Sequence, residues 1–342
     1  MIISNNIIHI ASMYELKFLI ILLFILIICT AYIYYIQKTD KLIFYKYITG
    51  GKDTKYKMSW NNSQEYTEEE AREFIQEVRE DVLGFSSMTT ERFKKLRSQI
   101  NKKWSDSQII VTWYMLSTGI AFRSYNRLGK IPNNILFNLN ARDLVTTARR
   151  YRVPPLALAK RSLEIKGYTK STIDKWANEP NSIWDTHVYD LIVKGWENDP
   201  ENPTTTRIIF DKAREYEIEV EKMLKATGVH FKTQADLTEE QTEIYGRAVI
   251  TPDFYFPKPI TIIVTHPDGS VTDHEINWID VKNYMFLGAS FITKSIREQS
   301  EKYVAKFGPG ALLFHYGFVN SMEFPGAVML SGSEQNGFSM IP

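Results

Sequence analysis

The feature that most constrains the fold is a β-hairpin pattern in the last third of the chain. A β-branched run over residues 260–265 is followed by the turn sequence Pro267-Asp268-Gly269-Ser270, and a second alternating run ends at Lys282. Val, Ile and Thr favour strands, whereas Pro, Asp and Gly favour tight turns. The pattern therefore predicts two antiparallel strands and, with them, a β-sheet in this part of the chain.

The returning strand carries an acidic and a basic side chain on one face. Because strand side chains alternate, Asp280 and Lys282 point the same way and Val281 points the other way. Asp253 lies at the start of a preceding strand, which Pro252 opens. Neighbouring strands lie about 4.8 Å apart, so the carboxylates of Asp253 and Asp280 can share one ion. Mg²⁺ prefers such oxygen ligands.

A predicted helix over residues 211–227 offers a third carboxylate. At about 100° per residue, its apolar stripe consists of Ala213, Tyr216, Val220, Met223 and Leu224. Glu217 falls within this stripe, whereas Glu215 and Glu219 face away. A carboxylate on a core-facing stripe costs free energy unless it is paired or binds a metal. We therefore predict Glu217 as the third ligand, with Glu221 at the edge of the stripe as the alternative.

In this order the residues resemble the PD-(D/E)XK nuclease superfamily, whose pattern is a helical Glu, Pro-Asp, Asp/Glu-x-Lys and sometimes a later Gln-x-x-x-Tyr. The counterparts here are Glu217, Pro252-Asp253, Asp280-Val281-Lys282, and Gln299 with Tyr303. Within the superfamily the chain resembles the codanin-interacting nuclease family of animals, which is related to archaeal Holliday-junction resolvases. This likeness rests on the segments EYE at 215–217, TPDF at 251–254, NWIDVK at 277–282 and FGPG at 307–310. The chain differs from the animal proteins in having Asp rather than Glu at position 280.

The resemblance implies metal-dependent hydrolysis of phosphodiester bonds. Glu217, Asp253, Asp280 and the carbonyl of Val281 would hold one or two Mg²⁺ or Mn²⁺ ions, which polarise the phosphoryl group and lower the pKa of a bound water. Lys282 would hold or help deprotonate that water and balance the charge of the transition state. The resemblance implies DNA more than RNA as substrate, and it is compatible with a homodimer; it identifies no protein partner.

Each part of the pattern also has a non-catalytic interpretation. Asp-x-Lys alone is common on surface strands. Gln299 and Tyr303 would line the site or contact the substrate backbone, but they also share a helical face with Ile292, Ile296 and Phe307, which is typical of ordinary packing. The alternative function is a catalytically silent nuclease-like module that binds nucleic acid or protein at a membrane. The complete ordered set favours the metal-dependent nuclease.

The N-terminal part contains a second strong pattern, an apolar run without charges from Phe18 to Ile36. Its length predicts a transmembrane anchor over residues 16–37. A cleaved signal peptide is the alternative, but the run exceeds the usual length and no small-x-small site follows it. Lysines at positions 38, 41, 46, 52, 55 and 57 follow the run, against Lys17 before it. The positive-inside rule therefore predicts a single-pass membrane protein with its C-terminal part in the cytosol.

Two short helical patterns in the middle region, over residues 141–152 and 155–166, are separated by Val153-Pro154. They are compatible with a helix-turn-helix that binds nucleic acid. Its phosphate contacts would come from Arg149, Arg150, Arg152, Lys160 and Arg161. A helical hairpin with a solvated basic face is the alternative.

The predicted chain is α/β, with an N-terminal transmembrane helix, a helical middle region and a C-terminal restriction-endonuclease-like mixed sheet flanked by helices. The predicted segments are an N-terminal segment (1–15), the anchor (16–37), a basic linker (38–60), the helical region (61–200), the nuclease domain (204–330) and a tail (331–342). The sole cysteine, Cys29, lies in the predicted anchor, which excludes an internal disulfide and a thiol nucleophile elsewhere. The net charge of +1 excludes no class of partner.

Overall fold

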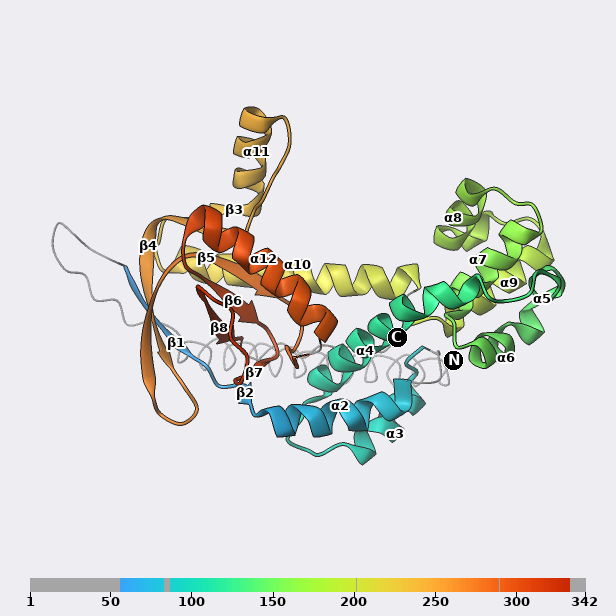
Figure 1. Cartoon of the computed structure of the whole chain (residues 1–342), viewed down its shortest axis with the longest axis horizontal. Helices are drawn as coiled ribbons and strands as arrows, with labels where there is room; N and C mark the ends of the chain where they lie inside the picture. Colours follow the sequence, from blue (N-terminus) through green and yellow to red (C-terminus); the bar gives the residue numbers. More distant parts are fainter. Residues whose placement is uncertain (1–55, 83–86, 201, 289, 333–342) are drawn as a thin grey trace, which may run out of the picture.

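The computed structural model describes residues 56–82, 87–200, 202–288 and 290–332 (Figure 1). A β-sheet with flanking helices lies at one end of the molecule and a small helical bundle at the other. Helices α4 (Asp106–Leu128) and α10 (Pro203–Ala226) run between these two parts (Figure 1).

The prediction of a transmembrane helix is corrected for the residues that the structure describes. No helix within the described ranges is both long enough and apolar enough to cross a membrane. Helices α4 and α10 have 23 and 24 residues, but polar and charged side chains interrupt their apolar faces. The segment predicted as the anchor, residues 16–37, lies outside the described residues, as does the preceding segment 1–15. The fold class is therefore corrected to a mixed α/β protein.

A six-stranded mixed sheet forms the larger core. Its path has the order β1 (Lys57–Asn61), β4 (Phe254–Thr265), β5 (Val271–Lys282), β6 (Gly310–Phe314) and β8 (Ala327–Ser331), and the short β3 (Lys232–Thr233) also pairs with β4. The β4–β5 pair is antiparallel, which confirms the predicted hairpin. The β1–β4, β5–β6 and β6–β8 pairs are parallel.

Two local features shape the hairpin. The pairing register of β4 shifts between Tyr255 and Ile260, where Pro257 and Pro259 lack the N–H groups that a regular ladder requires. At the other end, Gly269 adopts a positive φ of 83°, and the Asp268 carboxylate accepts a hydrogen bond from the Ser270 amide at 2.8 Å. This turn chemistry fixes which residues of the two strands face each other.

One helix covers each face of the sheet. On the first face, Tyr216, Val220 and Leu224 of α10 belong to a buried cluster with Phe256 and Ile262 of β4. On the opposite face, helix α12 (Ser290–Phe307) contributes Ile296 and Tyr303 to a cluster with Trp278 and Leu312. The helix that carries Glu217 and the helix that carries Gln299 thus lie on opposite faces of the sheet. Helix α11 (Gln234–Tyr245) projects away from the sheet (Figure 1).

The middle region contains two separate helical units. Helices α2 (Glu68–Val82), α3 (Thr90–Gln99) and α4 share a core with Met285 and Tyr316, so this unit packs on the sheet part. A two-stranded sheet of β2 (Glu65–Tyr66) and β7 (Phe318–Val319) also connects the segment before α2 to the segment after β6. The second unit has its own core and consists of α5 (Asn133–Asn138), α6 (Ala141–Tyr151), α7 (Pro155–Ile165), α8 (Lys170–Asn178), the 3₁₀ turn η2 (Pro180–Ser182) and α9 (Thr186–Asn198).

Strand β1 lies mostly within the predicted linker, residues 38–60. Its five residues, KMSWN, alternate between exposed and buried, and Met58 and Trp60 enter the core of the sheet. The Trp60 Nε1 donates a hydrogen bond to the Ser331 carbonyl at 3.0 Å. The chain therefore enters the sheet at residue 57, well before residue 204.

Candidate functional site

The candidate site lies where β4 begins and β5 ends. The register pairs Phe254 with Ile279, which places Asp253, the residue just before β4, beside the end of β5. The Val281 amide donates a hydrogen bond to Asp253 Oδ2 at 2.6 Å. The Gln234 amide holds the Asp253 carbonyl at 2.9 Å. The hairpin thus brings Asp253 and Asp280 together, as the sequence predicted.

Burial and mutual repulsion govern the carboxylates of the site. Asp280 is only 2% exposed. Burial, followed by the charge of Asp280, raises the pKa of Asp253 to about 7, although the hydrogen bond from Val281 opposes the shift. Burial, followed by the charge of Asp280, also raises the pKa of Glu217 on α10. A bound cation would offset this repulsion and keep the carboxylates ionised.

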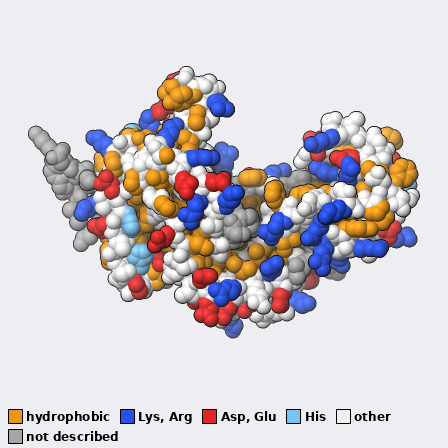
Figure 2. Space-filling view, in the orientation of Figure 1, with side chains coloured by type: hydrophobic (Ala, Val, Ile, Leu, Met, Phe, Trp, Pro, Cys, Tyr) orange, Lys and Arg blue, Asp and Glu red, His pale blue; other side chains and the backbone are white. Residues whose placement is uncertain are grey.

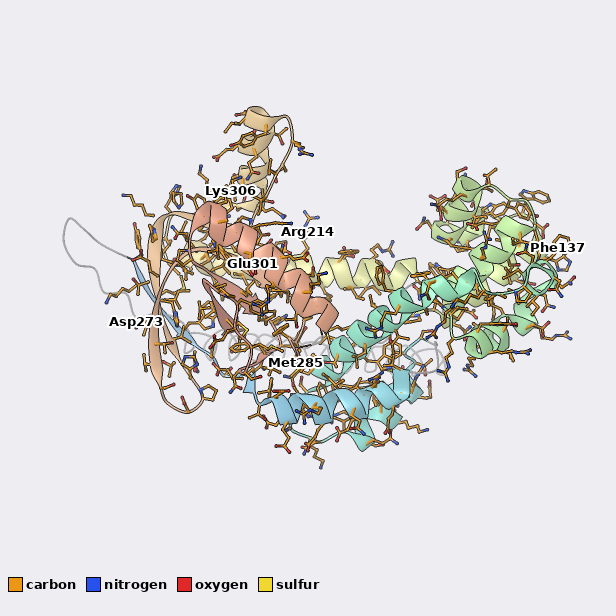
Figure 3. The ribbon with its side chains drawn as sticks, in the orientation of Figure 1. Phe137, Arg214, Asp273, Met285, Glu301 and Lys306 are labelled. Atoms are coloured by element: carbon orange, nitrogen blue, oxygen red, sulfur yellow. The ribbon has the colours of Figure 1, made fainter. Side chains whose placement is uncertain are left out.

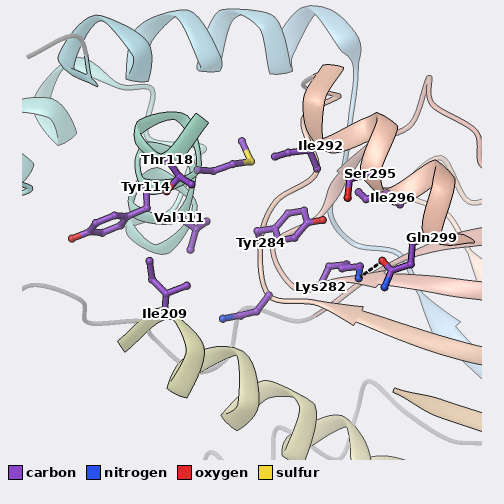
Figure 4. Close-up of a pocket in the computed structure, with 12 residues that line it drawn as sticks. Val111, Tyr114, Thr118, Ile209, Lys282, Tyr284, Ile292, Ser295, Ile296 and Gln299 are labelled. Atoms are coloured by element: carbon purple, nitrogen blue, oxygen red, sulfur yellow. Dashed lines mark hydrogen bonds between the residues drawn. The ribbon is translucent and has the colours of Figure 1, made fainter. Parts of the chain in front are cut away.

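Lys282 connects the aspartates to α12. Its Nζ forms an ion pair with Asp280 Oδ2 and donates a hydrogen bond to Gln299 Oε1 at 2.9 Å (Figure 4). Gln299 Nε2 in turn donates to the Tyr303 hydroxyl at 2.8 Å. The ammonium group is therefore held from two sides, and its side chain is 15% exposed.

Tyr303 completes this arrangement from the protein interior. Its hydroxyl donates to the Thr251 carbonyl at 3.1 Å and lies 3.4 Å from Asp280 Oδ1. Burial, followed by the charge of Asp280, raises the pKa of Tyr303, so its hydroxyl remains protonated. Its ring also packs against Trp278, with centroids 5.1 Å apart. Tyr303 thus has both of the roles considered for it, core packing and contact with the site.

The donor set suits a hard cation in type, but it is not a closed metal cluster. Within the described part of the chain, no group of three His, Cys, Asp or Glu side chains could hold a metal ion. The charge of Asp280 affects the pKa of Glu217, so the two side chains are near each other. Within the described residues, however, Glu217 does not form a metal-binding group of three carboxylates with Asp253 and Asp280. The Val281 carbonyl points to the same side as the Val281 amide, toward Asp253, because both groups of a strand residue face one neighbour.

Both oxygens of the Asp280 carboxylate have partners in the site. Oδ2 forms the ion pair with the Lys282 ammonium group, and Oδ1 lies 3.4 Å from the Tyr303 hydroxyl. Carboxylate and carbonyl oxygens are the ligands that Mg²⁺ prefers. By the chemistry of their donor atoms, Asp253, Asp280 and the Val281 carbonyl suit one divalent cation.

The basic residues of the middle region lie in the helical bundle, at the far end of α4 from the carboxylates (Figure 1). Helix α7 is buried along most of its length against its neighbours in the bundle, so it is not free to enter a DNA groove. Lys160 pairs with Asp174 at 2.8 Å and Arg161 with Glu164 at 2.7 Å. The arrangement matches the alternative of a helical hairpin, in which Arg149, Arg150 and Arg152 are exposed.

Sequence reasoning missed the residues that form a cavity beside Lys282. This cavity of about 450 Å³ lies between α4, α10 and α12 (Figure 4). Asn283 and Tyr284 line it and directly follow the Asp-x-Lys motif, a position that could have drawn attention to them. The contribution of α4 had no sequence signal, because it depends on the packing of α2–α4 onto the sheet.

A family comparison covers the C-terminal part of the chain. A family model described as "Protein of unknown function TPD sequence-motif" matches residues 185–332. The chain has this tripeptide at Thr251-Pro252-Asp253, within the candidate site.

A curated relative, "Uncharacterized protein L539" of Acanthamoeba polyphaga mimivirus, is 35% identical over 126 residues, which are 37% of this chain and 42% of the relative. The chain thus covers less than half the length of this relative. No solved structure matches the chain significantly. Neither the description of the family nor the name of the relative states an activity.

Proposed function

We propose that this protein is a metal-dependent nuclease that hydrolyses phosphodiester bonds, with DNA as the expected substrate. The main support is the convergence of Asp253, Asp280 and Lys282 at one edge of the sheet, in the order and spacing of the PD-(D/E)XK pattern. The hydrogen bonds from Lys282 through Gln299 to Tyr303 add to this support, because an ordinary surface Asp-x-Lys pair has no reason to be fixed from a second element.

The proposed mechanism assigns distinct roles to the residues of the site. Asp253, Asp280 and the Val281 carbonyl would hold Mg²⁺ or Mn²⁺, which supplies a Lewis acid for the phosphoryl oxygens and a bound water of lowered pKa. Lys282, held by Asp280 and Gln299, donates hydrogen bonds to the attacking water and to the charge that develops on the phosphoryl oxygens. Glu217 adds negative charge beside Asp280, which favours a divalent cation.

Gln299 and Tyr303 act on this chemistry through their neighbours. Gln299 fixes the position of the Lys282 ammonium group, so that the cation is oriented before substrate binds. Tyr303 keeps its proton and contacts Asp280, which limits the positions that this carboxylate can take. Both residues are positioning residues in this proposal.

A catalytically silent module that binds nucleic acid is the second candidate. It is favoured by the finding that Glu217 does not join the aspartates as a third ligand within the described residues. In that case Lys282 and its neighbours would bind a phosphate without cleaving it.

The two candidates are distinguished by cleavage assays on the purified full chain. Labelled single-stranded, duplex and branched DNA, and RNA, would be incubated with Mg²⁺, Mn²⁺ or EDTA. The variants are Asp280→Asn and Lys282→Ala, and the matched control is Asp273→Asn, an exposed aspartate of the same strand (Figure 3). We expect metal-dependent cleavage that both site variants lose and the control retains. Binding without cleavage in a folded preparation would favour the silent module.

A further inference from the structure

The cavity beside Lys282 is mainly apolar and is shared by several elements. Val111 and Met115 of α4, Ile209 of α10 and Ile296 of α12 contribute to its wall. Tyr284 lies between the α4 side chains and Lys282 (Figure 4). The cavity thus has apolar walls, the aromatic ring of Tyr284 at its side and the Lys282 cation, which would contact a phosphate, beside it. These are the features of a site for a nucleobase.

The apolar wall continues along α4 beyond the cavity. Residues 111, 115 and 118 line the cavity, and Phe122 and Tyr125 follow them at the same spacing of three and four, which places them on the same helical face. Phe122 is 77% exposed and Tyr125 is 44% exposed. At about 1.5 Å per residue, the stretch from Val111 to Tyr125 extends roughly 20 Å away from Lys282.

Exposed cations lie near the C-terminal end of α4. Arg127 Nη1 near the end of α4 donates to the Arg152 carbonyl at 3.4 Å, which attaches the helix to the turn between α6 and α7. Arg149, Arg150 and Arg152 are exposed at that turn. Figure 2 shows hydrophobic side chains along α4 and Lys and Arg side chains beside them, between the sheet and the bundle.

We propose that this face of α4 binds an unpaired nucleic-acid strand, with bases stacked on Tyr284, Phe122 and Tyr125 and phosphates near the arginines of the α6–α7 turn. An unpaired strand fits because its bases have free faces for stacking, whereas the bases of a duplex are already stacked on one another. The arginines supply the salt-dependent attraction to the backbone. The location of the cleaved bond at Lys282 rests on the proposed nuclease function, whereas strand binding by α4 does not.

A protein partner is the main rival occupant of an exposed aromatic surface. Two observations favour the strand. The aromatic face is continuous with the cavity that Lys282 and Gln299 line, and a group of exposed arginines lies at the turn that contacts the end of the same helix. A protein that only covered apolar residues would have no need for this continuity with the candidate site.

Fluorescence anisotropy on the full chain in EDTA tests the proposal independently of cleavage. The probes are a labelled single strand of about 20 nucleotides, as DNA and as RNA, and a blunt DNA hairpin. The test variant carries both Phe122→Ala and Tyr125→Ala. A second variant, Phe122→Trp with Tyr125 unchanged, keeps an aromatic ring at position 122 and should retain most of the binding. The matched control is Phe137→Ala, because Phe137 is 56% exposed on α5 at the far end of the bundle (Figure 3).

We expect the double variant to bind the single strand at least about fivefold more weakly, with hairpin binding and the Phe137→Ala control unchanged. The proposal would be overturned if the folded double variant bound the single strand as tightly as the wild type, or if it lost affinity for the hairpin and the single strand equally. It would also be overturned if the double variant lost self-association while its affinity for the single strand was unchanged. If strand binding depends on Phe122 but no nucleic acid is cleaved, the inference is supported and the proposed nuclease function is refuted. If Asp280→Asn abolishes cleavage but strand binding does not depend on Phe122, the nuclease function is supported and the inference is refuted.

Discussion

Lys282 connects the carboxylate of Asp280 to helix α12. Its ammonium group is held by Asp280 on its own strand and by Gln299 on the helix, so its position depends on both elements. The Asp-x-Lys spacing places the lysine beside the aspartate, but only the contact with Gln299 fixes the end of its flexible side chain. Residues outside the short motif therefore determine how precisely the motif is arranged.

Replacing Gln299 by Ala should lower kcat/KM for nucleic-acid cleavage roughly 10- to 100-fold without unfolding the protein. The reason is that Lys282 would lose one of its two fixed partners. Steady-state cleavage rates measure the effect, with Glu298→Ala as the control, since Glu298 is the exposed neighbour on the same helix. Equal rates in the two variants would show that Gln299 has only a packing role.

The raised pKa of Asp253 predicts a pH-dependent stability in the absence of metal. In the folded protein this group binds a proton up to about pH 7, whereas in the unfolded chain it loses the proton near pH 4. The folded state therefore binds more protons between these values, and stability falls as pH rises through this range, by an amount on the order of a few kcal/mol.

Thermal melts in EDTA between pH 4 and pH 8 measure this effect. Asp253→Asn should remove much of the decline and be the more stable form at pH 7.5, and Mg²⁺ should stabilise the wild type there but not the variant. Parallel pH profiles for the two proteins would contradict the raised pKa of Asp253.

The strands of the sheet differ in how far the sequence predicted them. The β4–β5 hairpin is long, β-branched and marked by a Pro-Asp-Gly turn, so local preferences were sufficient, and its register brought Asp253 to Asp280. Strand β1 has only five residues, two of them buried, and its pairing with β4 spans about 200 positions. Such a pairing depends on tertiary contacts that a single sequence does not reveal.

Helix α4 shows the same limit for the site. Its position against Lys282 depends on the shared core of α2–α4 with Met285 and Tyr316, which no local pattern of α4 encodes. The predicted helix-turn-helix had suitable local signals, but α7 has apolar residues on most of its faces and is the buried centre of a bundle. Local patterns thus identified the motif residues and not the surfaces around them.

At the start of β6, Gly310 allows the Trp278 ring to lie directly on the backbone. A Cβ atom at this position would be 2.0 Å from Cε2 of Trp278. Gly310→Ala should therefore lower the free energy of unfolding by about 1–3 kcal/mol through overpacking. Urea denaturation checks this, with Gly129→Ala as the control, since a Cβ there meets nothing within 4 Å. An equal effect of both changes would exclude close packing as the cause.

On the scale of the whole molecule, strands from both ends of the described chain belong to the same sheet. Trp60 is 2% exposed in the core, and Asn62 Nδ2 donates to the Met329 carbonyl at 3.1 Å, so β1 and the segment after it are attached to β8. The helical units lie between these two segments in the sequence but outside the sheet in space (Figure 1). The helical units are thus inserted in the sequence between two parts of the same sheet, and they do not precede it.

Trp60→Ala should reduce the free energy of unfolding of the whole chain by about 3–5 kcal/mol, because it removes a large buried ring and its hydrogen bond to Ser331. Trp184→Ala is the matched control, since Trp184 is 87% exposed. Its expected effect is within about 0.5 kcal/mol. Chemical denaturation of the full chain measures both, and similar values for the two variants would show that β1 is not needed for the stability of the sheet.

The pairing of β1 also has a consequence for how the protein is made. Trp60 forms its hydrogen bond with Ser331, 271 positions later in the chain, and its strand partner β4 begins at Phe254. A ribosome adds about 5–20 residues per second, so β1 waits for many seconds before its neighbours exist. During that time the unit of α5–α9, which has its own core, can already fold, whereas the apolar side chains of Met58 and Trp60 remain exposed. Factors that shield nascent chains are therefore expected to bind this protein at β1 until synthesis has passed β8.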